Sequence, residues 1–159
     1  MSSPRSRRIP ALIGFIGAAV VAGAIGSWAT LENVRTWFPL LQKPAWNPPA
    51  WLFAPVWTTL YLLMGVAIWR AWRAGGSAAP RLVRLYFGQL FFNALWSVLF
   101  FGLKQPAWAL ADILVLWGLL VWLQAGLWRN DRLAGALWLP YVLWVSFATA
   151  LNAAIVRLN

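Results

Sequence analysis

The sequence contains no cysteine and no histidine, and it has only three acidic residues among 159. These absences exclude disulfides, thiolate nucleophiles, the usual zinc and copper ligands and the commonest axial ligands of haem. The three carboxylates are too few for a paired-carboxylate active site or an oxygen-ligand metal cage. We therefore expect no resident metal ion, no cofactor and no conventional acid–base catalytic set.

Charge is also scarce, because charged residues make up 10% of the chain and hydrophobic residues 62%. A soluble domain carries about 25% charged residues, so this composition indicates an integral membrane protein. The net charge of +10 does not point to nucleic acid. The basic residues form short clusters beside apolar runs and no aromatic-interleaved basic face.

Apolar runs of about 20 residues, the length that a helix needs to cross a bilayer, recur along the chain. They are too long for barrel strands and lack strict alternation. The sequence therefore predicts an all-α integral membrane protein, a five-transmembrane-helix bundle that forms a single membrane domain over residues 1–159. The expected helices lie near 9–29, 50–69, 82–103, 106–128 and 133–156, and a loop occupies 30–49.

The first apolar run leaves two interpretations open. Arg5, Arg7 and Arg8 precede it, and the small residues Ala22-Gly23-Ala24 resemble the cleavage site of a secretory signal. The run is longer than the apolar region of about 7 to 15 residues in a typical signal. A retained transmembrane helix is therefore the favoured interpretation.

Basic residues divide unevenly between the two ends of the predicted bundle, which indicates its orientation. The positive-inside rule places the amino terminus in the cytoplasm and the carboxyl terminus, with the 30–49 loop, outside. The amino-terminal end carries Arg5, Arg7, Arg8, Arg70, Arg73, Arg81, Arg84, Arg129 and Arg132, and the other end carries Arg35, Lys43, Lys104 and Arg157.

Tryptophan and proline concentrate in the loop and just after it. Proline fixes its own φ and biases the preceding residue toward extended backbone, so this segment is partly pre-organised. The indoles of Trp46 and Trp51 suit either stacking on a planar ligand or anchoring at the membrane interface. The prolines are Pro39, Pro44, Pro48 and Pro49.

Polar residues inside the third predicted span share one helical face. Gln89, Asn93 and Trp96 recur at i, i+4 and i+7. An amide in hydrocarbon needs a partner, so hydrogen bonding between helices is the favoured role of this face, and ligand contact is the alternative.

Asp112 is the only carboxylate placed within a predicted span. Intramembrane acids are functional candidates, whereas a position near a helix amino terminus would make the same residue a structural cap. The expected partners of its carboxylate are Lys104 or Arg35.

Two prolines are expected to bend their helices beside aromatic residues. Pro140 precedes Trp144 and Ala148, which share a helical face, and that face could line a cavity next to Trp51. Pro55 has a similar bending role near the start of the second span.

Several short motifs occur together between residues 37 and 159. They are Leu41-Gln42-Lys43-Pro44 with Trp46, Pro48, Pro49 and Trp51; Pro55-Val56-Trp57 with Tyr61 and Met64-Gly65; Gln89, Asn93, Trp96 and Phe100-Phe101-Gly102; Trp108 and Asp112; and Pro140-Tyr141 with Trp144, Leu151-Asn152 and Arg157. This combination resembles the translocator protein family, whose members are also called tryptophan-rich sensory proteins or peripheral-type benzodiazepine receptors. The chain looks like a bacterial member.

The resemblance implies a five-helix bundle, often dimeric, with a cavity beneath the first loop. That cavity would bind porphyrins such as protoporphyrin IX and flat synthetic ligands. Some bacterial members are reported to consume protoporphyrin in light, which makes Trp51 and Trp144 candidate catalytic residues. Carried over by motif, the residues lining the cavity would be Trp46, Trp51, Tyr61, Asn93, Trp108, Trp144 and Ala148.

Three functions remain as hypotheses. The leading one is a non-enzymatic membrane receptor or carrier for tetrapyrrole transport or sensing, with Lys43, Arg35 or Arg157 meeting the propionates. The alternatives are a light-dependent porphyrin-degrading enzyme that uses cavity tryptophans, and a ligand-responsive regulator that acts through a protein partner.

The expected partners are a tetrapyrrole, the lipid bilayer and a second copy of the chain. Animal members of the family carry a cholesterol motif that ends in a tyrosine after the Leu-Asn pair. Here Ala153 and Ala154 follow Asn152, so the sterol motif is incomplete.

Overall fold

The computed structural model describes residues 8–159. Five of its helices are long and apolar enough to cross a membrane. They are α1 (Arg8–Thr30), α3 (Phe53–Ala74) with the preceding 3-10 turn Ala50–Leu52, α4 (Ala79–Ser97) with the π-helical segment Val98–Gly102, α5 (Pro106–Asn130) and α6 (Arg132–Leu158). The predicted all-α fold with five membrane helices is confirmed. Arg5 and Arg7, which entered the orientation and secretory-signal interpretations, lie outside the described residues.

Local sequence accounts for several helix ends. Proline lies in the first turn of both α4 and α5, where its missing N–H is not needed. Gly75 and Gly76 follow α3 with φ of 73° and 83°, a conformation that side chains with a Cβ rarely adopt. Asp131 caps α6 by accepting hydrogen bonds from the N–H groups of Leu133 and Ala134.

The segment between α1 and α3, predicted as a loop over residues 30–49, is not loop throughout. It contains the short helix α2 (Asn33–Thr36) and a 3-10 turn over Phe38–Leu40, so helix occupies part of residues 30–49. The Asn33 side chain donates to the Phe101 carbonyl at 2.8 Å, and this contact fixes α2 against the π-helical segment that follows α4.

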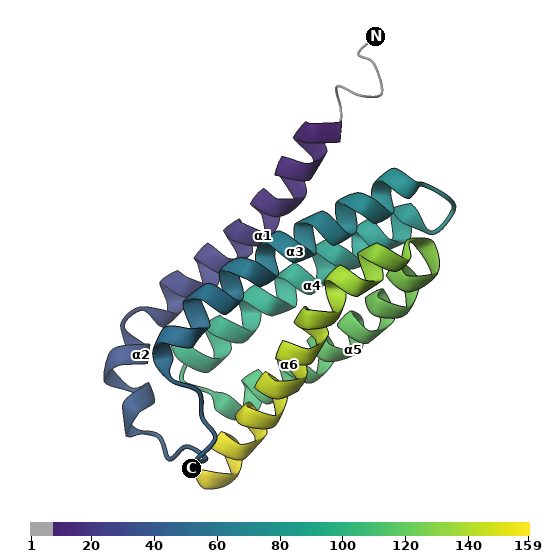
Figure 1. The fold of residues 1–159 in the computed structure, drawn as a ribbon. Helices are drawn as coiled ribbons and strands as arrows, with labels where there is room; N and C mark the ends of the chain where they lie inside the picture. Colours follow the sequence, from purple (N-terminus) through teal and green to yellow (C-terminus); the bar gives the residue numbers. More distant parts are fainter. Residues whose placement is uncertain (1–7) are drawn as a thin grey trace.

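The membrane helices pack in the ring order α1, α3, α6, α5, α4, and α4 returns to α1. Figure 1 shows that the carboxyl terminus lies beside the segment between α2 and α3, at the opposite end from the start of α1. Helix α1 approaches α3 closely at Gly65, where an added Cβ would lie 2.8 Å from the Ile16 Cα atom. A small residue is required at such a backbone contact.

Candidate ligand-binding groove

An open groove of about 710 Å³ lies between α3 and α6. Its volume is within the range of about 300 to 1,000 Å³ that is usual for small-molecule sites. The hydroxyl of Thr59 donates to the Pro55 carbonyl within α3. The lining residues are Trp51, Leu52, Pro55, Val56, Thr59, Leu60, Leu63, Pro140, Leu143, Trp144 and Phe147.

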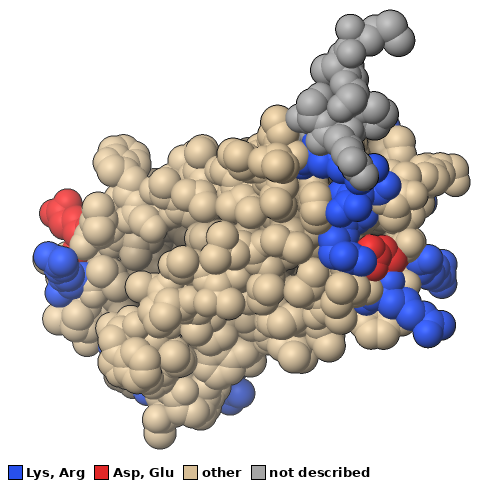
Figure 2. Space-filling model, turned by 45° about the horizontal axis from the view of Figure 1, so that its top comes forward, with Lys and Arg blue, Asp and Glu red and all other residues tan. Residues whose placement is uncertain are grey.

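Each wall of the groove is one face of one helix. On α6, Pro140, Leu143, Trp144 and Phe147 recur at the spacing that places side chains on one face. Pro140 lies inside α6 without ending it. The lining contains no charged residue, and Figure 2 shows that lysine and arginine gather toward the ends of the molecule, away from a broad uncharged surface.

Aromatic rings occupy the end of the groove nearest the α2–α3 segment. Trp144 packs edge-on against Phe53, with ring centroids 5.8 Å apart. Trp46 packs edge-on against Phe147 at 5.6 Å, and Phe147 in turn lies 5.7 Å from Trp144. Trp51 has 71% of its surface exposed, so a large indole face is available at the groove.

Lys43 makes several contacts within the α2–α3 segment. The Lys43 ammonium donates to the carbonyls of Phe38, Leu41 and Pro39 at 2.9, 2.7 and 3.3 Å. It also lies 5.0 Å from the centre of the Phe38 ring. Lys43 therefore fastens its own loop, and the propionate contact predicted for it from the sequence would have to compete with these carbonyls.

Tyr61 and Asn93 lie behind the groove wall, in the bundle interior. Asn93 donates to the Tyr141 hydroxyl at 2.9 Å, and that hydroxyl donates to the Gln89 side-chain oxygen at 2.9 Å. Trp57 stacks on Tyr61 at 5.4 Å and contacts Tyr141 at 6.2 Å. These contacts support the helix-linking role predicted for the amides, because they join α4 to α6.

A second buried amide links three helices near the loop end of the bundle. The Trp96 indole N–H donates to the Asn152 side-chain oxygen at 3.0 Å. The Asn152 amide nitrogen donates to the Pro106 carbonyl at 2.9 Å. Asn152 has 1% of its surface exposed, so both of its polar atoms are satisfied inside the bundle.

The predicted site residues are thus only partly brought together. Trp51 and Trp144 line the groove, Trp46 contacts it through Phe147, and Tyr61 and Asn93 lie behind it. Ala148 is half-buried and packs against the core one turn after Trp144. Trp108 is 67% exposed on α5 and is absent from the groove lining. Its role in binding stays a prediction.

The sequence profile of the TspO/MBR family matches residues 15–158. The chain belongs to this family. It is 40% identical to the tryptophan-rich protein TspO of Archaeoglobus fulgidus over 148 residues, which cover 93% of this chain and 96% of the relative. It is 38% identical to the tryptophan-rich sensory protein of Cereibacter sphaeroides, and the match covers 91% of this chain and 90% of the relative. It is 37% identical to the human translocator protein, and the match covers 94% of this chain and 85% of the relative.

Membership of the TspO/MBR family confirms the resemblance that the tryptophan and proline motifs indicated. Together with the five apolar helices it identifies an integral membrane protein. The orientation of the termini and a homodimer stay predictions.

Asp112 lacks the partners that the sequence predicted for it. Its side chain is buried, and neither carboxylate oxygen has a hydrogen-bond partner within residues 8–159. The expected ion pairs with Lys104 or Arg35 are therefore wrong. The cap interpretation is also wrong, because Asp112 lies beyond the first turn of α5 and that turn contains no acidic residue.

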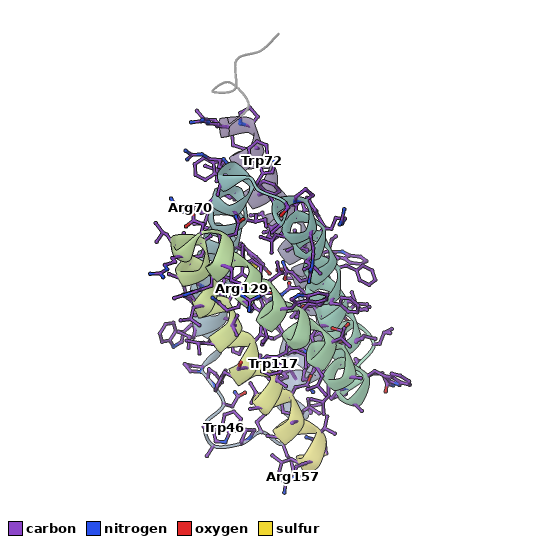
Figure 3. The ribbon with its side chains drawn as sticks, turned by 90° about the vertical axis from the view of Figure 1, so that its right-hand side faces the viewer. Trp46, Arg70, Trp72, Trp117, Arg129 and Arg157 are labelled. Atoms are coloured by element: carbon purple, nitrogen blue, oxygen red, sulfur yellow. The ribbon has the colours of Figure 1, made fainter. Side chains whose placement is uncertain are left out.

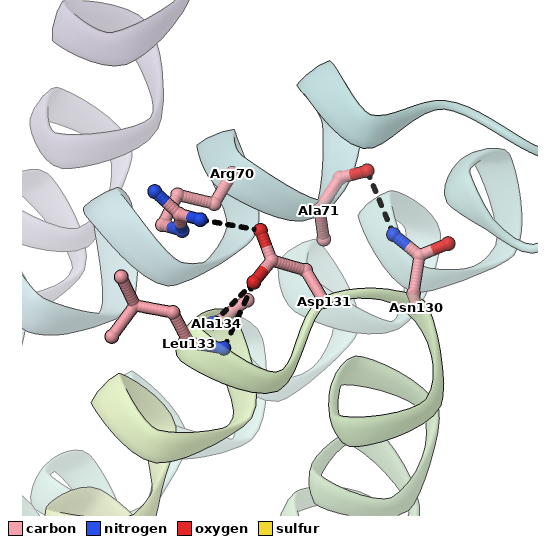
Figure 4. Close-up of polar contacts among 6 residues, drawn as sticks. All are labelled: Arg70, Ala71, Asn130, Asp131, Leu133 and Ala134. Carbon is pink, nitrogen blue, oxygen red and sulfur yellow. Dashed lines mark hydrogen bonds and ion pairs between the residues drawn. The ribbon is translucent and has the colours of Figure 1, made fainter.

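The ion pair found in the described part of the chain involves a different carboxylate. Asp131 lies 2.9 Å from the Arg70 guanidinium and accepts the two backbone hydrogen bonds at the start of α6 (Figure 4). Partial burial favours the protonated acid, but the hydrogen bonds and the Arg70 charge outweigh it and lower the pKa of Asp131. This cluster joins α3 to the α5–α6 turn.

Most residues that line the groove on α3 were not predicted from the sequence. Leu52, Val56, Thr59 and Leu63 follow helical spacing along α3, and Leu143 accompanies Trp144 on α6. That spacing was available from the sequence. It did not reveal which face met another helix and which was left open, because both faces of a membrane helix are apolar.

Proposed function

We propose that this protein is a membrane receptor or carrier that binds porphyrins such as protoporphyrin IX in the α3–α6 groove. The observation that carries the proposal is the groove itself, which has a volume of about 710 Å³ and indoles in its lining. A planar macrocycle would stack on Trp51 and Trp144, since aromatic rings prefer offset or edge-on contact with another π-system.

The composition of the groove favours a metal-free ligand. The sequence offers no histidine or cysteine to coordinate iron, and residues 8–159 contain no cluster of metal-ligating side chains. Binding would then depend on the apolar face of the macrocycle. Free-base porphyrin is therefore expected to bind at least as well as its iron complex.

The propionates of a porphyrin would pair best with a cation at the loop end of the bundle. Arg157 is exposed in the last turn of α6 and lies toward the same end of the bundle as Trp46 (Figure 3). Lys43 is already held by loop carbonyls. We assign the propionate contact to Arg157, whose guanidinium can bind a carboxylate through two N–H groups.

The experiment is a titration of the purified protein with protoporphyrin IX in the dark, followed by tryptophan fluorescence. We expect saturable quenching whose amplitude falls in Trp51→Phe and Trp144→Phe, because these variants remove the indoles nearest the ligand. Trp28→Phe is the matched control, since Trp28 is 81% exposed on α1, outside the groove. A titration without saturation would reject porphyrins as ligands.

A second function is favoured by the indoles at the groove. Trp51 or Trp144 could donate an electron to a photoexcited porphyrin, and the reduced porphyrin would pass that electron to dioxygen to give superoxide. The ligand would then return an electron to the indole radical, and the resulting porphyrin radical cation would combine with superoxide, so that the net reaction adds dioxygen to the ligand and the tryptophan is restored. Illumination of the complex in air should then yield a new chromophore in the wild type. Because either indole could serve as donor, the decisive variant is Trp51→Phe/Trp144→Phe, and unchanged product formation in this double variant would rule out the enzymatic function.

A further inference from the structure

A second groove lies at the opposite half of the bundle, between the start of α4 and the end of α5. Its volume is about 410 Å³, and it shares no residue with the α3–α6 groove. One part of its lining is polar and basic and the other is apolar. The lining residues are Ser77, Ala78, Arg81, Leu82, Leu85, Trp122, Ala125, Gly126, Arg129 and Asn130.

Two arginines give this groove its charge. Arg81 comes from the first turns of α4 and Arg129 from the last turn of α5, and both are exposed. The nearby carboxylate, Asp131, is paired with Arg70 at 2.9 Å, which is the ion pair found within residues 8–159. The positive charges of Arg81 and Arg129 are therefore not neutralised by an acidic side chain.

The apolar part of the groove fixes one of these arginines. The Arg81 guanidinium lies over the Trp122 ring at 4.5 Å from its centre. This cation–π contact holds the group in place and leaves its N–H edge open to an anion. Gly126 allows α5 to pack closely against α4 beside the groove, because a Cβ there would lie 2.6 Å from the end of the Leu82 side chain.

Both helices that form the groove are membrane spans, so its position limits the possible occupant. The basic part lies at the helix ends, and Leu85 and Trp122 continue toward the apolar middle of α4 and α5. Basic pockets between membrane helices bind anionic lipid headgroups. A soluble anion would use the arginines alone, whereas a lipid would use both parts.

We propose that this groove binds one anionic phospholipid. Its phosphate is held between Arg81 and Arg129, and its acyl chains begin along Leu85 and Trp122. The site is separate from the proposed porphyrin site, so porphyrin binding and lipid binding can succeed or fail independently.

The test measures lipid retention by native mass spectrometry of the intact protein released from detergent. The probes are dioleoylphosphatidylglycerol and, as the uncharged-headgroup comparison, dioleoylphosphatidylcholine. The variant Arg81→Gln/Arg129→Gln removes both cations of the groove. The matched control Arg84→Gln/Arg132→Gln removes the same charge from the same end, at exposed residues outside the lining.

We expect the wild type and the control to retain phosphatidylglycerol preferentially. The groove variant should lose roughly 20- to 30-fold in apparent affinity, given the usual contribution of each arginine near an anionic surface. Equal losses in the two double variants would overturn the proposal, because they would indicate bulk charge. Unchanged affinity for phosphatidylglycerol in both double variants would also overturn the proposal.

A charge-neutral variant tests the shape of the site. Ala125 is exposed and lines the groove, so Ala125→Phe should block it without altering any arginine. We expect this variant to lose phosphatidylglycerol preference as well. Two results would show that a lipid is not the occupant. One is an undiminished preference of Ala125→Phe for phosphatidylglycerol, and the other is that glycerol 3-phosphate stabilises the wild type as much as phosphatidylglycerol does.

Discussion

The side-chain amide of Asn159 pairs with both backbone polar groups of Gln42, although 117 residues separate them. The Gln42 N–H donates to the Asn159 side-chain oxygen at 3.0 Å, and the Asn159 nitrogen donates to the Gln42 carbonyl at 3.0 Å. This reciprocal contact attaches the α2–α3 segment to the end of α6. Trp46, a few residues later in the same segment, packs against Phe147.

Replacing Asn159 with alanine should loosen this segment and leave the bundle intact. The two bonds are exposed, so their combined loss is expected to cost about 1 kcal/mol locally. Hydrogen exchange of the Gln42 amide should accelerate about 5-fold. Asn130→Ala, which removes a 3.0 Å bond to the Ala71 carbonyl at the other end, is the control. If the Gln42 amide exchanges equally slowly in both variants, the side chain of Asn159 does not attach this segment to α6.

Lys43→Met should have a larger effect on the same segment. Its ammonium bonds to three carbonyls, and hydrogen bonds to charged groups contribute roughly 1.5 to 3 kcal/mol each when well formed. We expect protease cleavage between residues 38 and 50 to become at least about tenfold faster. If cleavage stays as slow as in the wild type, Lys43 does not fasten the loop.

The interior hydrogen bonds predict a coupling between Tyr141 and Gln89. Tyr141→Phe leaves the Gln89 oxygen without the donor found 2.9 Å away. Hydrogen bonds between membrane helices contribute about 0.6 kcal/mol on average and up to about 1.7. A double-mutant cycle with Gln89→Leu, measured by unfolding in mixed micelles, should give a coupling of that size. Additive effects would mean that the bond contributes nothing.

The Asp131 cluster predicts a loss of stability in acid. Because folding lowers the pKa of Asp131, its contribution is complete above the unfolded value of about 3.9 and is lost as pH falls through the lower folded value. Unfolding temperatures measured from pH 6 to pH 3 should therefore fall more steeply for the wild type than for Asp131→Asn. Parallel curves would show that the ion pair with Arg70 has no net effect.

Sequence reasoning located the membrane helices because a bilayer imposes a length of about 20 apolar residues on each span. It also identified Gln89 and Asn93 as interior residues, since an amide in hydrocarbon needs a partner. It failed at Asp112, whose neighbours come from other helices and depend on how each helix is rotated. Rotation is set by packing between apolar faces, which the sequence pattern does not distinguish.

The same limit explains the outcome at the groove. Trp51 and Trp144 were predicted as neighbours, and both line it. Trp108 was grouped with them by motif, but its 67% exposed indole is outside the lining. The role of Lys43 was also missed, because its three acceptors are loop carbonyls that leave no trace in the side-chain pattern.

The most direct test of porphyrin binding in the α3–α6 groove compares two adjacent threonines. Thr58 and Thr59 are both exposed, and each donates to the carbonyl four residues earlier at 2.9 Å. Only Thr59 lines the groove. Thr59→Trp should therefore fill it, whereas Thr58→Trp places the same indole outside it.

The measurement is the dissociation constant of protoporphyrin IX in the dark, taken from the shift of the porphyrin absorption band. If the ligand binds in this groove, Thr59→Trp should lower the affinity for protoporphyrin IX by at least about tenfold, or 1.4 kcal/mol. Thr58→Trp should keep the wild-type affinity. Equal affinities in both variants would contradict the assignment of the ligand to this groove.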